Sequence, residues 1–214
     1  MPFNRSWRVL RPVLFVITLL AVGAAGLNPT ASAANTGSIV PKDTVVVGNL
    51  SRNTTFDFQI EAILGGTPFF FSVHCGQTTL AGKTPAAAGD LKIPLQSETF
   101  AGCKVPRTRP PSGGKVYVTT SGTWNLTLGT PASTPILATL QIAHFSARIP
   151  FFGDCRYRIS GNLGGIYNND GVLNLDGGAR YTETSACPPA YPSGQQVMSM
   201  SGRFVFDPVF KEKP

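Results

Sequence analysis

Alternation of apolar and polar residues is the feature that most constrains how this chain of 214 residues can fold. In the segment TTFDFQI, Phe56, Phe58 and Ile60 alternate with Asp57 and Gln59. The segments KVYVTT, GTWNLTL, CRYRI and GRFVFD repeat the pattern. A period of two places one set of side chains against a core and the other set in solvent, so each segment predicts a β-strand.

Turn-forming pairs separate these segments at short intervals. They are Gly65-Gly66, Gly113-Gly114, Asp170-Gly171 and Asp176-Gly177, and such residues tolerate the backbone angles that tight turns need. About a dozen candidate strands follow one another with too little chain between them for crossover helices. The sequence therefore predicts an all-β fold, an antiparallel sandwich or barrel, with no substantial helix after the N-terminal segment.

The segment ILATLQIAHFSA (136–147) is the one stretch in which a helix competes with a strand. Leu140, Ile142 and His144 fit a period of two as well as a helical period, and the β-branched residues favour a long strand. Across the chain, the alternation predicts buried side chains at Phe56, Phe58, Phe70, Trp124, Leu126, Tyr157, Ile159, Phe204 and Phe206.

The first 33 residues have the composition of a secretory signal peptide. Arg5, Arg8 and Arg11 form a basic head, an apolar run of 15 residues extends from Val13 to Leu27, and Ala31-Ser32-Ala33 offers a cleavage site. The alternative is an uncleaved membrane anchor, which needs roughly 18 apolar residues or more. We therefore predict cleavage after Ala33 and a secreted or cell-envelope location.

Removal of residues 1–33 leaves 181 residues with 15 basic and 11 acidic side chains, a net charge of +4. That charge is ordinary for solubility and indicates no particular polyanion. The predicted organisation is a flexible lead-in over 34–42, a single all-β domain over 43–208 and a tail over 209–214. No membrane span is predicted in the mature chain.

Four cysteines follow the predicted cleavage site, at Cys75, Cys103, Cys155 and Cys187. An exported chain oxidises its cysteines by default, and four cysteines allow three pairings that the sequence does not distinguish. Pairing of sequence neighbours closes loops of moderate length, so we predict the bridges Cys75–Cys103 and Cys155–Cys187.

Residues able to carry catalysis or to bind metal form no motif. The chain has no GxSxG and no CxxC, and a disulfide-bonded Cys75 beside His74 cannot act as a nucleophile. The EF-hand acid position before Gly171 is occupied by Ile166, so this stretch predicts a hairpin turn rather than a calcium loop. We predict no catalytic, cofactor or metal residues. The alternative is a secreted hydrolase in which acids such as Asp154, Asp170, Asp176 and Glu183 converge near His144.

Basic residues gather in two segments, 104–115 and 148–158. The candidate anion-binding face comprises Arg107, Arg109, Arg148, Arg156 and Arg158. Two interpretations stay open: a basic face for an acidic polymer, or the solvated side of a half-buried strand. Tyr157 lies on the opposite side of its strand from the arginines, which disfavours nucleic acid because stacking aromatics must be exposed.

Over residues 70–208 the chain resembles uncharacterised exported proteins common in actinobacteria. The likeness consists of FAGC ending at Cys103, GTWNL (122–126), CRYRISGNLGGIYNN (155–169), Cys187 and GRFVFDP (202–208). The resemblance implies a secreted, β-rich domain with two disulfides and no known activity. Together with the residues above, it leads us to expect a non-enzymatic interaction module whose partner is an acidic envelope polymer or another extracellular protein.

Overall fold

The computed structural model describes residues 37–64, 67–106, 114–129, 135–150, 153–185 and 197–213. The predicted signal peptide, Arg107, Arg109 and Cys187 lie outside these ranges. The described strands are β1 (Ser38–Val40), β2 (Val45–Leu50), β3 (Phe56–Leu64), β4 (Thr67–Lys83), β5 (Lys92–Lys104), β6 (Tyr117–Ser121), β7 (Trp124–Leu128), β8 (Ile136–Ile149), β9 (Cys155–Asn168), β10 (Val172–Ser185), β11 (Val197–Asp207) and β12 (Lys211–Lys213).

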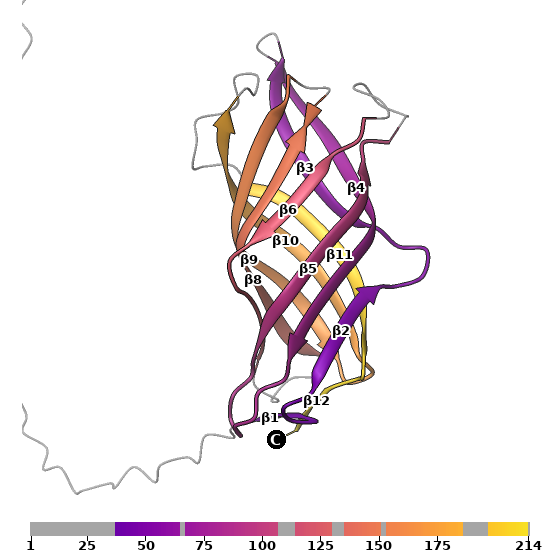
Figure 1. Cartoon of the computed structure of the whole chain (residues 1–214), viewed down its shortest axis with the longest axis vertical. Helices are drawn as coiled ribbons and strands as arrows, with labels where there is room; N and C mark the ends of the chain where they lie inside the picture. The colour runs from indigo at the N-terminus through magenta and orange to yellow at the C-terminus, as the bar shows by residue number, and fades with distance from the viewer. Residues whose placement is uncertain are drawn as a thin grey trace, which may run out of the picture. The chain divides into compact units, whose positions relative to one another are not determined.

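Ten of these strands form one antiparallel sheet that closes into a barrel (Figure 1). Eight make the ring, in the order β10, β9, β8, β7, β5, β4, β2 and β11, and β11 pairs with β10 to close it. The remaining two extend the ring, because β3 continues the position of β2 between β4 and β11, and β6 continues that of β7 beside β8. The all-β prediction is confirmed, and of its two architectures the structure is the barrel.

When β2 with β3, and β6 with β7, are each counted as one interrupted strand, consecutive strands of the chain are neighbours in the sheet, as in an up-and-down barrel. Short connections achieve this, and the predicted hairpin turn is one of them. Asn169, Asp170 and Gly171 join β9 to β10, with the Gly171 amide donating to the Asn168 carbonyl at 2.9 Å. Gly171 has a φ of 89°, a conformation that favours glycine.

The alternation in the sequence becomes the inner and outer faces of the barrel. Along β9, Cys155, Tyr157 and Ile159 are buried while Arg156 and Arg158 are exposed. The interior of an eight-stranded barrel is just wide enough for side chains to fill it. Every residue predicted to be buried points into it except Phe70.

Phe70 is 53% exposed, so its predicted burial is wrong. Because Phe69, Phe70 and Phe71 are all apolar, the sequence at this point does not show which side chains face the interior. The alternation of inward and outward residues in β4 can be read only from the residues that follow. Val73 and Cys75 are fully buried, which places Phe70, three and five residues before them, on the outer face.

Aromatic side chains fill the barrel interior in two groups. In the first, Phe100 contacts Phe56, Trp124 and Phe145 at ring-centroid distances of 5.1, 6.0 and 5.1 Å. In the second, Tyr167 stacks on Phe210 at 4.5 Å, and its hydroxyl donates a hydrogen bond to the Phe210 carbonyl. Aromatic pairs of this kind stabilise a fold by about 0.5–1.5 kcal/mol each beyond the area that they bury.

The lower end of the barrel in Figure 1 is closed by the two-stranded sheet of β1 and β12, and we call it the cap end. Composition predicts a flexible lead-in and a tail here, but Ser38–Val40 and Lys211–Lys213 pair with each other. Ile39 and Phe210 are fully buried, so the two ends are ordered by the apolar surface that they bury.

A disulfide joins Cys75 on β4 to Cys103 on β5, which confirms the first predicted bridge. The two residues are direct cross-strand partners on the inner face. Cys155 is buried and carries no free thiol, whereas its predicted partner Cys187 lies outside the described residues. The second bridge therefore stays a prediction. Within the described ranges, no helix has the length and apolar character to cross a bilayer.

Candidate functional site

Basic side chains gather at the end of the barrel opposite the cap end. Strands β5 and β8 finish there and β6 and β9 begin there, so segments far apart in sequence become neighbours. The described basic residues of this region, which we call the basic face, are Lys104, Lys115, Arg148, Arg156 and Arg158, and all five are exposed.

The strand register sets these residues in rows on the outer surface. Tyr117 on β6 pairs with Arg148 on β8, which pairs with Arg156 on β9. One step along the same face, Thr119 pairs with Ser146, which pairs with Arg158. Residues two apart on a strand point to the same side, so both rows face solvent together.

Tyr117 lies within the basic face and is 45% exposed. The Lys115 ammonium lies 4.8 Å from the centre of its ring, and the Arg148 guanidinium carbon lies 5.9 Å from it. Cation–π contacts at exposed sites are worth about 0.5–1 kcal/mol each. They hold two positive charges around one accessible aromatic ring.

Among the described residues, Asp154 is an acidic residue in contact with the basic face. Its carboxylate accepts a hydrogen bond from Arg148 Nε at 2.6 Å and lies 3.9 Å from Arg156 Nη2. This hydrogen bond raises the pKa of Arg148. Since the pair is exposed, it offers little stability. Among the described residues, five positive charges thus stand against the one carboxylate that is seen to contact them.

A bulge in β8 opens a groove beside the basic face. Between Ile142 and Phe145 the pairing with β9 shifts register, because two residues of β8 oppose one of β9. The extra residue turns His144 outward and returns Phe145 to the interior. A regular alternation would put His144 on the same face as Leu140 and Ile142, but the bulge interrupts that alternation and leaves His144 on the surface.

The groove has a volume of about 330 Å³ and is lined by Thr119, Ser121, His144, Ser146 and Arg158, with Phe145 beneath. We call it the hydroxyl groove. Within the described part of the chain, none of the five polar side chains has a hydrogen-bond partner, so all are available to a ligand. No acidic residue is among the described residues that line it, so the described groove gives no support for acids converging on His144.

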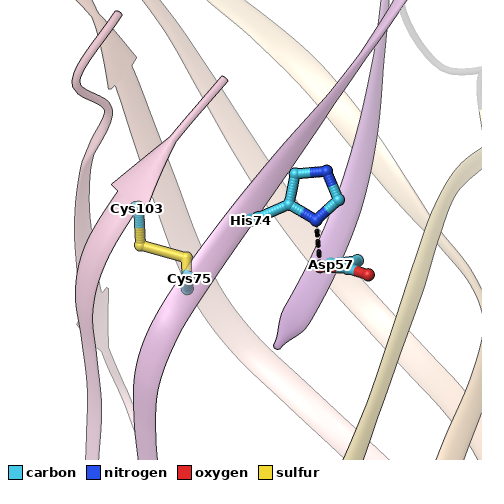
Figure 2. Close-up of a disulfide and its surroundings, with 4 residues drawn as sticks. All are labelled: Asp57, His74, Cys75 and Cys103. Carbon is cyan, nitrogen blue, oxygen red and sulfur yellow. Dashed lines mark hydrogen bonds and ion pairs between the residues drawn. A yellow bond between two sulfur atoms is a disulfide. The ribbon is translucent and has the colours of Figure 1, made fainter. Parts of the chain in front are cut away.

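A second groove, of about 220 Å³, lies on the outer face of β3, β4 and β11. Asp57 and His74 are cross-strand partners there, and their Oδ1 and Nδ1 atoms are 2.7 Å apart (Figure 2). Ser72, Ser199 and Ser201 complete the polar lining. In Figure 2 the second ring nitrogen of His74 lies on the far side of the ring from Asp57.

The Asp57–His74 pair provides two of the three parts of a serine nucleophile system. A carboxylate on Nδ1 fixes the imidazole with Nε2 as the acceptor, which a general base requires. Among the described residues, however, no serine hydroxyl is hydrogen-bonded to His74. The sequence does not predict this pair, because only the β3–β4 register brings residues 17 positions apart together.

The candidate site residues are therefore of three kinds. Arg148, Arg156 and Arg158 of the candidate face lie close together, Arg107 and Arg109 lie outside the described residues, and the hydroxyl groove and the Asp57–His74 pair are new. No set of three or more His, Cys, Asp or Glu side chains within the described ranges is placed to hold a metal ion.

Comparison with known proteins adds no relative to this geometry. No protein-family model, no curated protein and no solved structure matches the chain.

Proposed function

We propose that the protein is an exported, non-enzymatic binding module whose basic face contacts an acidic polymer of the cell envelope. The observation that carries the proposal is the convergence of Lys104, Lys115, Arg148, Arg156 and Arg158 on one end of the outer surface, where the carboxylate of Asp154 contacts two of them. A surface of one sign attracts an oppositely charged ligand and speeds its association.

The barrel suits this role because side chains fill its interior and the basic residues lie on its outer face. The aromatic interior and the β4–β5 disulfide hold the strands in place, so the basic side chains project from a rigid scaffold. A preorganised site loses less conformational entropy when it binds.

Nucleic acid is a weaker candidate for the partner. Binding of single strands uses successive exposed aromatic rings as stacking platforms. Tyr117 is exposed within the basic face, whereas Tyr157 is fully buried, so the described surface offers one ring there.

The Asp57–His74 pair supports a second candidate function, hydrolysis by a serine nucleophile. A generic ester assay of the secreted protein tests it, with His74→Gln and Asp57→Asn as the matched variants. Ester turnover that both substitutions abolish would establish the hydrolase and contradict the non-enzymatic proposal.

Export is tested by the mass of the protein recovered from culture medium. We expect an intact mass that corresponds to a chain beginning at Ala34. Recovery only from membranes, with Trp7 retained, would contradict export with cleavage.

Polymer binding is tested with polyphosphate, a polyuronate and single-stranded DNA at two salt concentrations. We expect Lys104→Ser/Arg156→Ser/Arg158→Ser to lower the affinity for the acidic polymers by tenfold or more, on the order of 1.4 kcal/mol or more. The matched control is Arg52→Ser/Lys92→Ser/Arg203→Ser, which removes the same charge from exposed positions elsewhere on the barrel. Equal losses in both triple variants would show that net charge, and not this face, governs binding. DNA bound more tightly than either polymer would overturn the choice of partner.

A further inference from the structure

We propose that the hydroxyl groove is a specific binding site for a tetrahedral oxyanion, namely a phosphoryl or sulfuryl group carried by the acidic polymer. This inference rests on the proposed function and names the chemistry that the basic face selects. The ligand is selected by the side chains that line the groove, which are Thr119, Ser121, His144, Ser146 and Arg158. The lysines and arginines around the groove attract the polymer from a distance.

Two coincident irregularities create the groove. Strand β6 ends at Ser121 and β7 begins at Trp124, so the ladder along β8 is interrupted between the pairs Ser121↔His144 and Asn125↔Gln141. The bulge of β8 falls at the same level. Regular strands would present a continuous ridge of side chains here, whereas this break leaves a hollow across three strands.

Contacts with neighbouring residues fix the conformation of the interruption between β6 and β7 and of the bulge in β8. Gly122 has a φ of 78°, and a Cβ atom there would lie 2.8 Å from the Cβ of Ala143, so glycine is required at this turn. Trp124 Nε1 donates a hydrogen bond to the His144 carbonyl at 3.3 Å, which ties the bulge to the interior. A site held on strands by such contacts keeps its geometry without the ligand.

The donors of the groove match an anion with three or four oxygens. Three hydroxyls, one imidazole and one guanidinium converge from β6, β8 and β9. A guanidinium donates two parallel hydrogen bonds to a phosphoryl group or to a carboxylate. A carboxylate has only two oxygens for the remaining donors, whereas a tetrahedral group offers further oxygens to the hydroxyls.

The surroundings favour a polymer over a single ion. Arg148 and Arg156 lie two residues along their strands from Ser146 and Arg158, on the same outer face. Two residues of a strand span roughly 6.6 Å. The row of Tyr117, Arg148 and Arg156, which Asp154 contacts, therefore lies at the distance of the next charged group of a chain whose first group occupies the groove.

The two histidines of the chain provide a direct readout, because His144 lies in the hydroxyl groove and His74 lies in the other groove. We expect titration with short polyphosphate to move the imidazole NMR signals of His144 further than those of His74, which is the cross-strand partner of Lys104 in the basic face. Movement of the His74 signals alone would overturn the assignment.

Selectivity is tested with polyphosphate, dextran sulfate and polygalacturonate of matched charge per chain. We expect the wild type to bind one of the tetrahedral polymers at least about tenfold more tightly than polygalacturonate, as hydrogen bonds to a charged group allow. The first two polymers distinguish phosphoryl from sulfuryl recognition. Thr119→Ala/Ser146→Ala keeps every charge, so we expect it to lose the preference while its affinity for polygalacturonate stays unchanged.

The matched control is Thr127→Ala/Thr139→Ala, an exposed cross-strand pair on β7 and β8 outside the groove, which should keep the preference. Arg158→Lys retains the charge but not the paired donors of the guanidinium. It should therefore lose the preference for the tetrahedral polymer, as Thr119→Ala/Ser146→Ala does. Equal affinity of the wild type for all three polymers would overturn this inference and leave the proposed function standing. Absence of binding to any of them would overturn both.

Discussion

At the scale of single residues, Trp124 shows how much one interior side chain contributes. Its indole is fully buried, with ring centroids 6.0 Å from Phe100 and 6.4 Å from Phe145. We expect Trp124→Ala to lower the free energy of unfolding by about 3–5 kcal/mol, because the vacated space cannot fully collapse. Chemical denaturation measures the loss, and Trp124→Phe, which keeps most of the volume, should lose less. A loss below about 1 kcal/mol for the alanine variant would contradict the packing seen here.

Glu212, on β12, is an acid that the cap end holds out of solvent. It is 5% exposed, and neither carboxylate oxygen has a hydrogen-bond partner among the described residues. Burial raises the pKa of its carboxyl above the ordinary value of 4.5. The folded chain therefore binds the proton more tightly than the unfolded chain, so stability falls as the pH rises from that ordinary value through the raised one.

We expect Glu212→Gln, which keeps the shape but removes the charge, to be more stable than the wild type at about pH 7. The difference should vanish at about pH 3, where both forms are neutral in both states. Thermal unfolding across this range measures it. A variant that is less stable than the wild type at neutral pH would show that the carboxylate has a stabilising partner.

At the scale of the elements, the disulfide joins β4 to β5 close to the C-terminal end of β5. The bridged residues are 28 positions apart, and in the chain-entropy picture such a bridge contributes about 3–4 kcal/mol. We expect Cys75→Ala/Cys103→Ala to lose that amount in chemical denaturation. Peptide mapping without reduction should show the bridge Cys155–Cys187 as well. A peptide that joins Cys75 to Cys155 or to Cys187 would contradict both predicted pairings.

At the scale of the whole molecule, the barrel closes where its first and last strands meet. Gly48 on β2 pairs with Phe206 on β11, and a Cβ atom at Gly48 would lie 2.7 Å from the Phe206 ring. That ring is buried against Tyr167 and Phe210, so it has no room to move away. We expect Gly48→Ala to cost about 1–3 kcal/mol of stability, the usual effect of overpacking.

The matched control for closure is Gly76→Ala, because a Cβ atom there meets nothing within 4 Å. It should leave stability unchanged or slightly raise it, since alanine restricts the unfolded chain. Equal destabilisation by the two substitutions would show that the contact across the closing strands is not the cause.

The sequence by itself determined the elements of this protein, because a period of two is a local property that fixes both strand and facing. The long strand over 136–147, the turn at Asn169, Asp170 and Gly171, and the inward side of Tyr157 and Trp124 all follow from it. The bridge Cys75–Cys103 agrees with the expected pairing of sequence neighbours, but the sequence allows three pairings, and the β4–β5 register selects this one.

Only the tertiary structure decided what depends on register and closure. A sandwich and a barrel share the same alternation, and the pairing of β11 with β10 and β2 distinguishes them. A single inserted residue in β8 turned His144 outward, and the β3–β4 register brought Asp57 to His74. Burial of Ile39 and Phe210 ordered two ends whose composition indicates flexibility. These features depend on contacts between distant segments, whose free energies no local pattern records.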